Sequence, residues 1–273
     1  MLNNPDDELT RYLIIGRARS GTTMIHLTLM GHPNVAALND ELKPEPLLTK
    51  GISSFTFGND TAEEKSMGSE ALFDAITAIT RKNVTRANGA KTVINSAVVA
   101  SRVVSHLQEY IPRLKIIHVV REDLVALYGS AQQGRKSGVM HSWNTGFSER
   151  EIDKTRVSKH KFTHFALGCL ETRAVVGRLE DSHDYLEVAY EEYLRQPRVI
   201  EQQLMEFLNL PHVPVTWLNS EKVLPPASEY IVNYEQLTTL NLELVQQVED
   251  GRVSQKFRQF ARAGAVLNRL SWK

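Results

Sequence analysis

The stretch that decides the fold is Tyr12-Leu13-Ile14-Ile15-Gly16-Arg17-Ala18-Arg19-Ser20-Gly21-Thr22-Thr23. Its first four residues form a short apolar run that is typical of a buried strand, and a helical pattern follows over residues 22–30. Gly31 and Pro33 predict the end of that helix, because glycine accepts the left-handed cap conformation and proline cannot continue a helix. The predicted order is therefore strand, glycine loop, helix.

The loop between this strand and this helix has two glycines at the spacing of a phosphate-binding loop. Backbone amides and the helix dipole attract an anion at such a place. A nucleoside triphosphatase carries a lysine directly after the second glycine, whereas this chain has Thr22 there and places Arg17 and Arg19 earlier. The pattern disfavours γ-phosphate transfer from ATP and indicates a phosphate or sulfate site that needs no magnesium.

Arginine and uncharged donors are the predicted ligands of this anion. Arg19 can donate two parallel hydrogen bonds to a phosphate or sulfate, and hydroxyl groups add further donors. The loop residues expected to bind it are Arg17, Arg19, Ser20, Gly21, Thr22 and Thr23. The alternative is a Ser/Thr helix cap that happens to follow two arginines.

A second arginine follows a second buried strand, residues 114–120. Arg121 leaves the end of that strand, and Ser130 lies nine residues further along the predicted helix. Both side chains can converge on one anion at the carboxyl edge of a parallel sheet. The alternative is a surface pair between Arg121 and Glu122 or Asp123, with a neutral Ser130 on the helix.

Together these two elements resemble the sulfotransferases that use 3′-phosphoadenosine 5′-phosphosulfate (PAPS). The residues 19–23, followed by a helix and His32-Pro33, are similar to the family's 5′-phosphosulfate loop, and Arg121 with Ser130 is similar to its 3′-phosphate element. The resemblance implies PAPS as sulfuryl donor, its desulfated form PAP as product, and no metal. It also implies that Tyr190, after the strand 185–189, lies beside the adenine, although a tyrosine there is equally typical of core packing.

The spacing within residues 121–141 looks closest to the bacterial trehalose-type (carbohydrate) sulfotransferases. The resemblance covers residues 11–210 in scattered motifs. The chain departs from the cytosolic members of the family because it lacks their late Arg-Lys-Gly cluster. Which late residue completes the 3′-phosphate pocket is left open.

The expected catalytic base is a carboxylate shortly after the first helix, as the resemblance implies. Counting from His32-Pro33 favours Asp40, and matching the following leucine favours Glu41, whose longer side chain reaches further from a loop. Lys91 could contact the leaving phosphate, but a solvated lysine at a strand edge is the expectation.

Two further groups of residues have an expected role. Both His26 and His118 are expected to be structural. The segment with His141 and Trp143 could line an acceptor site, because a Trp face packs well on sugar rings, and a surface loop with one anchoring Trp is the equal alternative.

Strands that alternate with helices predict an α/β fold, namely a single P-loop-like domain over residues 1–273 with a central parallel sheet and helices on both faces. The core is expected at 11–210, and 211–273 is expected to be mostly helical. Residues 33–60 are expected to be irregular, 68–88 and 161–179 helical, 91–94 and 185–189 strands, 97–110 and 122–133 helices, and 134–153 a loop.

Composition limits the classes of function and the location that the sequence allows. The chain has 32 basic and 32 acidic residues and one cysteine, Cys169. The zero net charge disfavours a nucleic-acid binder, and the lone cysteine with no targeting segment predicts a cytoplasmic location. No apolar run approaches the roughly 20 residues that span a bilayer.

A small-molecule or glycan acceptor is expected, with carbohydrate, lipid and metabolite hydroxyls all open, and a homo-oligomer is compatible with the sequence.

Two rival functions follow from the same loop. A P-loop nucleotide or small-molecule kinase predicts magnesium dependence, and the threonine at position 22 counts against it. A non-catalytic PAP-binding module predicts nucleotide binding without turnover.

Overall fold

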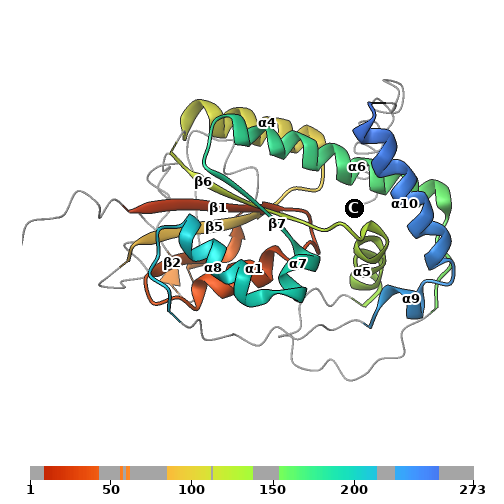
Figure 1. Cartoon of the computed structure of the whole chain (residues 1–273), viewed down its shortest axis with the longest axis horizontal. Helices are drawn as coiled ribbons and strands as arrows, with labels where there is room; N and C mark the ends of the chain where they lie inside the picture. The colour runs from red at the N-terminus through yellow and green to blue at the C-terminus, as the bar shows by residue number, and fades with distance from the viewer. Residues whose placement is uncertain are drawn as a thin grey trace, which may run out of the picture.

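The computed structural model describes residues 9–42, 56–57, 60–61, 85–111, 113–137, 154–213 and 225–251. Within them a five-stranded parallel sheet forms the centre of the molecule (Figure 1). Its order is β2-β5-β1-β6-β7, with β1 spanning Thr10–Gly16, β2 Val35–Leu42, β5 Ala87–Val93, β6 Lys115–Val120 and β7 Tyr185–Ala189. Two short strands, β3 (Thr56–Phe57) and β4 (Asp60–Thr61), pair separately in antiparallel fashion.

The strand β1 is the middle of this sheet because it is apolar throughout its inner part. Its residues 12–15 are completely buried. Gly16 pairs in register with Val93 of β5 on one side and with Val119 of β6 on the other. The carboxyl ends of the three central strands therefore meet at one edge, which is where open α/β sheets bind ligands.

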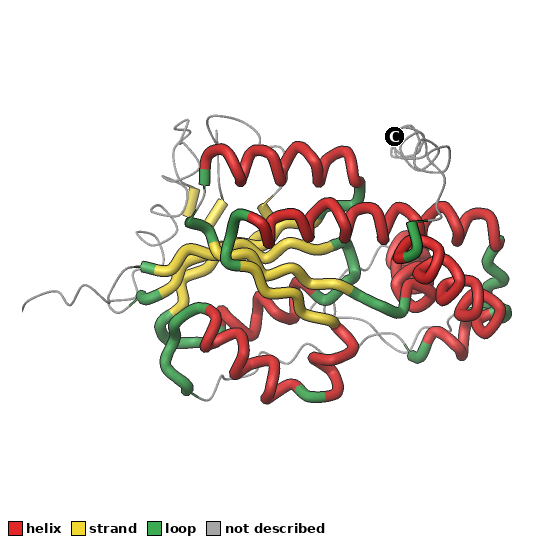
Figure 2. Tube along the Cα trace, turned by 45° about the horizontal axis from the view of Figure 1, so that its top comes forward, coloured by secondary structure: helices red, strands yellow, loops and turns green. Residues whose placement is uncertain are grey.

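Helices cover both faces of the sheet (Figure 2). They are α1 (Thr22–Met30), α4 (Ala97–Tyr110), α5 (Leu124–Ser137), α6 (Lys159–Gly177) with the 3₁₀ turn η1 (Arg178–Asp181), α7 (Tyr190–Arg195), α8 (Pro197–Phe207), α9 (Ala227–Tyr230) and α10 (Tyr234–Glu249). The α/β fold with a central parallel sheet and helices on both faces, predicted from the sequence, is confirmed.

Three apolar clusters hold these layers together. One face of the sheet packs against α4 and α6, with Val103 and Val176 completely covered, and the other packs against α1 and α8, with Ile25 and Leu204 covered. A third cluster joins α5, α6, α9 and α10 around Phe162 beyond the carboxyl edge of the sheet. Through this third cluster the last described helices, α9 and α10, pack beside the carboxyl edge of the sheet.

Several predicted elements are observed where they were expected. The strand at 185–189 and the helices at 22–30 and 97–110 are present with those bounds. The strands predicted at 12–15 and 114–120, and the helix predicted at 161–179, differ by at most two residues at either end.

Three expectations about local structure are wrong. Residues 35–42 form the strand β2 instead of an irregular segment, so Asp40 and Glu41 belong to a strand and not to a loop. Residues 87–88 belong to β5, which begins four residues earlier than predicted, and are not helical. Residues 134–137 continue α5 instead of starting a loop. In each case the sheet or the neighbouring helices override a weak local signal.

Candidate functional site

The candidate site begins with the loop that joins β1 to α1. Ser20 folds back on it, since both its backbone N–H and its Oγ donate to the carbonyl oxygen of Arg17, at 3.1 and 2.8 Å. Arg19 and Gly21 have φ values of 72° and 98°, in the left-handed region. A non-glycine residue rarely adopts this conformation, and such strain is typical of functional sites.

The N-terminus of α1 faces this loop without a side-chain cap. Within the described residues no side-chain cap bonds to this helix end, and its first turn contains no acidic residue. The first amides of a helix have no partner within the helix, and the helix dipole adds positive potential there. The alternative of a Ser/Thr cap is therefore not what the structure shows, and the helix end can hold an anion.

Three of the predicted ligands from three different elements meet beside the loop. The Nε of Arg19 donates to Oγ of Ser130 at 3.0 Å, and Nη1 of Arg121 donates to the carbonyl oxygen of Arg19 at 3.1 Å. The Nε of Arg121 is buried, has no hydrogen-bond partner within the described part of the chain, and lies 3.7 Å from Oε1 of Glu191. Sequence reasoning paired Arg121 with Ser130 and assigned Arg19 to the loop, and the structure brings all three to one place.

The alternative for Arg121 was a surface pair with its acidic neighbours. Asp123 instead accepts from the N–H of Ala126 and from the hydroxyl of Tyr234, at 2.8 and 2.9 Å. The carboxylate of Glu191 accepts from the N–H groups of Glu122 and Asp123. The start of α5 is therefore capped by carboxylates, while the guanidinium of Arg121 is directed to the loop.

The aromatic ring of Tyr190 closes one side of this arrangement. Tyr190 directly follows β7, and the guanidinium carbon of Arg121 lies 4.8 Å from its ring centroid. The ring also packs on Gly21, where an added Cβ would lie 2.5 Å from its Cδ2. The glycine is thus required both by the left-handed backbone and by the close approach of the ring.

The electrostatics of the cluster favour an anion. Burial, and then the charge of Arg121, lower the pKa of Arg19, with Tyr190 and Tyr230 acting in the opposite direction. Two guanidinium groups this close repel each other, and a negatively charged ligand would relieve that repulsion.

Tyr230 is a residue of this site that sequence reasoning missed. It is 4% exposed, and its hydroxyl would lie 2.8 Å from a Cβ added to Gly129, the residue before Ser130. Burial raises the pKa of its phenol, and the charges of Arg121 and Arg19 oppose that effect. It comes from α9, which has no motif, so only the three-dimensional structure reveals it.

Lys91 is not the solvated lysine that was expected. It lies within β5, is 6% exposed, and its Nζ donates to Oγ1 of Thr23 at 3.2 Å, in the first turn of α1. In the sheet it is in register with Glu41 of β2. The backbone of Glu41 therefore lies beside the strand that brings an ammonium group to the loop.

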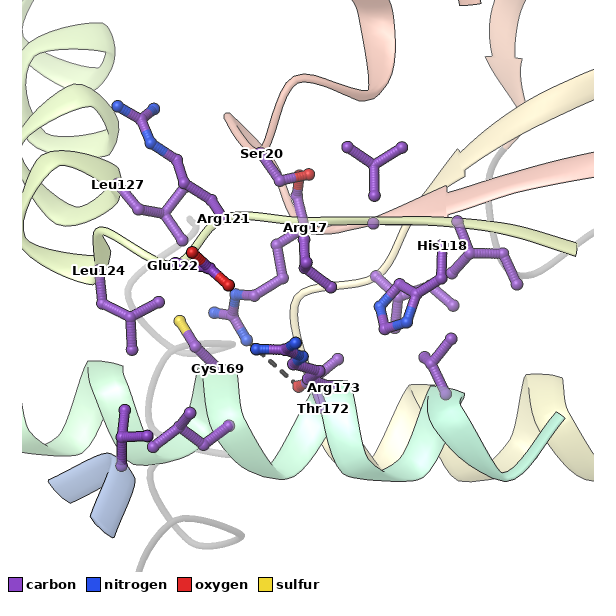
Figure 3. A pocket seen from close by; sticks show the side chains of 18 of the residues that line it. Arg17, Ser20, His118, Arg121, Glu122, Leu124, Leu127, Cys169, Thr172 and Arg173 are labelled. Atoms are coloured by element: carbon purple, nitrogen blue, oxygen red, sulfur yellow. Dashed lines mark hydrogen bonds between the residues drawn. The ribbon is translucent and has the colours of Figure 1, made fainter. Parts of the chain in front are cut away.

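Arg17 leaves the loop in another direction. Figure 3 shows its guanidinium turned toward α6, whereas that of Arg121 is turned away from it. Its Nη1 donates to the carbonyl oxygen of Gly168 at 3.1 Å and to Oγ1 of Thr172 at 3.2 Å. The structure thus separates Arg17 from Arg19, with which sequence reasoning had grouped it.

The remaining predicted residues are either buried or lie outside the described part of the chain. His26 and His118 are buried, as structural residues are. His141 and Trp143 lie outside the described residues, and so do the side chains of Asp40 and Glu41. Among the described residues no three His, Cys, Asp or Glu side chains could hold a metal ion, and no described helix is long and apolar enough to span a membrane.

Comparison with known proteins gives a family. Residues 12–214 match the sulfotransferase family. No curated protein sequence matches the chain. Among solved structures, a sulfotransferase from Alicyclobacillus acidocaldarius is similar at 14% identity and a TM-score of 0.48, with 92% of this chain and 99% of that chain covered. The sulfotransferase domain of the Synechococcus PCC 7002 olefin synthase has 16% identity, a TM-score of 0.45 and coverage of 88% and 98%. Mouse sulfotransferase SULT7A1 complexed with PAP has 12% identity, a TM-score of 0.47 and coverage of 91% and 87%.

Proposed function

We propose, since the chain belongs to the sulfotransferase family, that this enzyme takes the sulfuryl group from PAPS and transfers it to an acceptor hydroxyl. The observation that carries the proposal is the meeting of Arg19, Arg121 and Ser130 beside the uncapped N-terminus of α1. Two guanidinium groups and a free helix end form an anion site at the carboxyl edge of the sheet. A nucleotide with phosphate groups at the 3′ and 5′ positions of its ribose fits a site with several such donors.

The 5′-phosphosulfate is assigned to the loop and the first turn of α1. Backbone amides of the loop and the hydroxyls of Thr22 and Thr23 are uncharged donors there. Lys91 adds a positive charge beside Thr23, where negative charge grows on the leaving phosphate during transfer. The cation thus comes from β5 instead of from the loop, in agreement with a loop that lacks a lysine of its own.

The 3′-phosphate and the adenine are assigned to the other end of the cluster. Arg121 and Ser130 supply a guanidinium and a hydroxyl for the 3′-phosphate. We assign the missing late residue to Tyr230, whose hydroxyl lies against the same turn of α5. Tyr190, which already packs against the guanidinium of Arg121, offers a ring face on which the adenine can stack.

The transfer itself needs a base for the acceptor. As the acceptor oxygen attacks sulfur, its proton passes to a carboxylate and the bond from sulfur to the 5′-phosphate oxygen breaks, which releases PAP. We propose Glu41 as this carboxylate, with Asp40 as the alternative. The register of Glu41 with Lys91 supports the choice, because it brings the backbone of Glu41 beside the strand that contacts α1.

For the acceptor we propose only a chemical class, a hydroxyl compound. The resemblance of residues 121–141 to trehalose-type enzymes favours a carbohydrate hydroxyl, while lipid and small-metabolite hydroxyls are the other candidates. His141 and Trp143 are proposed to line its site. A cytoplasmic location is proposed from the single cysteine, Cys169.

Calorimetric titration with PAP tests the nucleotide site. Replacing Arg19 or Arg121 with alanine is expected to weaken PAP binding by about 10- to 100-fold, because each change removes charge-assisted hydrogen bonds. Arg195→Ala is the matched control, since this arginine at the end of α7 is exposed and pairs only weakly with Glu192 at 3.6 Å. Equal PAP affinity in the parent and both site variants would contradict the proposal.

A further inference from the structure

A cavity of about 350 Å³ lies between the carboxyl ends of β1 and β6 and the helices α5, α6 and α10 (Figure 3). Its volume falls within the range of about 300–1,000 Å³ that small-molecule sites occupy. The cavity is on the α6 side of the sheet, whereas α1 packs on the opposite face. It adjoins the anion site at the start of α1 and shares the loop, Ser20 and Arg121 with it, but it extends to the opposite face of the sheet.

Each element around this cavity contributes apolar side chains to its wall. The sheet contributes Ile15 and Val119, α5 contributes Leu127, α6 contributes Leu170 and α10 contributes Val245. Leu242, also in the lining, is 65% exposed. An exposed leucine beside an apolar cavity is suited to contact with an apolar ligand.

Arg17 is the cation that enters the cavity. Both of its hydrogen bonds, to Gly168 and Thr172, come from Nη1 alone, and its other contact is the ring of Phe165 at 5.4 Å. In the part of the chain that the structure describes, it forms no ion pair. A guanidinium has five donors, so most of them can still bind an anionic ligand.

Asn241 supplies the second polar group. It is 7% exposed, and its Nδ2 donates to the carbonyl oxygen of Glu122 at 3.4 Å, which fixes the orientation of the amide. Its Oδ1 is buried and has no partner among the described residues. An unsatisfied buried acceptor is unfavourable, and a ligand with an N–H or O–H would satisfy it.

Among the charged side chains that line the cavity, Arg17 is the cation that can bind a ligand within it, because the others are paired, turned away or exposed to water. Arg173 is paired with Glu187 through two hydrogen bonds. The guanidinium of Arg121 is directed away from the cavity (Figure 3). Glu122 and Glu249 are exposed, so water screens their charges.

We propose that this cavity is a second binding site, for a compact apolar molecule that carries one anionic group and one hydrogen-bond donor. The anionic group pairs with Arg17, the donor binds Oδ1 of Asn241, and the apolar body fills the space between α5, α6 and α10. The site does not depend on the proposed transfer reaction. Because Arg17 belongs to the phosphate loop, its ligand is expected to alter nucleotide affinity as well.

The fluorescent probe 1-anilinonaphthalene-8-sulfonate has this chemistry, with two aromatic groups, one sulfonate and one N–H. Titrated into the folded full-length protein, it is expected to saturate one site. Arg17→Met is expected to weaken binding about tenfold or more, and Val245→Trp to abolish it by filling the cavity. Arg19→Met, the same change two residues along on the other side of the loop, is expected to leave the probe affinity as it is.

Two further measurements keep the test decisive. Circular dichroism and the melting temperature check that each variant is folded, and Leu242→Trp replaces Val245→Trp if the latter does not fold, since its side chain is exposed. Saturating PAP is expected to leave the probe bound. The proposal is overturned if PAP displaces the probe one for one, if no saturable site is found, or if Arg17→Met and the tryptophan variant bind as the parent does.

Discussion

His26 makes the stability of this protein sensitive to acid. It lies in α1, is 1% exposed, and its Nε2 is 2.7 Å from the carbonyl oxygen of Leu38, so Nε2 carries the proton and donates. Its Nδ1 is buried without a partner among the described residues. A second proton would therefore create a buried N–H with no acceptor. Burial, opposed by the hydrogen bond to Leu38 and aided by the charge of Lys91, lowers the pKa of His26 from 6.5 to about 4.

The direction and size of the effect follow from this pKa. Between about pH 6.5 and pH 4 the unfolded chain binds a proton that the folded chain refuses, so stability falls as the pH falls. The group contributes its stability above pH 6.5 and loses about 2–3 kcal/mol of it by about pH 4.5, at 1.36 kcal/mol per pKa unit.

Urea unfolding from about pH 7 to about pH 4.5 measures this loss. His26→Gln keeps a donor for the carbonyl of Leu38 but cannot titrate, so its stability is expected to fall by about 2–3 kcal/mol less than that of the parent over this range. His160→Gln, the same change at an exposed position of α6, is the control. If His26→Gln and the parent lose equal stability on acidification, the reasoning about the buried imidazole is refuted.

Three further predictions concern the nucleotide site. Gly21→Ala forces a left-handed residue against the ring of Tyr190 and is expected to lower stability by about 1–3 kcal/mol and weaken PAP binding, measured by thermal unfolding and calorimetry; unchanged values would contradict the packing described. Glu41→Gln is expected to keep PAP affinity and lose turnover, and an active Glu41→Gln with an inactive Asp40→Asn would make Asp40 the base. Tyr230→Phe is expected to weaken PAP binding by about 3- to 10-fold without changing the affinity for adenosine 5′-phosphosulfate, which lacks the 3′-phosphate; equal losses for both nucleotides would remove Tyr230 from the 3′-phosphate site.

The parts of the fold that the sequence predicts well are those with strong local signals. The strands β1 and β6 contain short apolar runs, and the end of α1 before Gly31 is marked by glycine and proline. The anion site follows from the same signals, because Arg19 lies in the loop after β1 and Arg121 directly follows β6. Parallel topology then brings the strand ends together.

The parts that it predicts poorly depend on tertiary context. The strand β5 contains Asn88, Gly89 and Lys91, which are unusual in strands, yet all are buried between β1 and β2. Gly89 is needed there because an added Cβ would lie 2.5 Å from the ring of Tyr12. In β2 the apolar run is short, and its register with β5 shifts between Ala37 and Glu41. No local pattern marks these strands.

The same limit applies within the site. Arg17 and Arg19 are two residues apart and chemically alike, yet the left-handed turn at Arg19 sends them to different places. The hydroxyl of Tyr230 reaches the site only because α9 packs on α5, at a separation of about 100 residues from Ser130. Such contacts are set by packing between distant segments.

The central claim is that the site binds the adenosine 3′,5′-bisphosphate part of PAPS. The most direct test is the melting temperature of the protein with PAP, compared with ATP plus magnesium at equal concentration. At about 100 times its dissociation constant, PAP is expected to add about 2.7 kcal/mol of stability and to raise the melting temperature by about 5–10 °C, while ATP with magnesium has little effect. A rise with ATP and magnesium and none with PAP would contradict the account and point to a kinase.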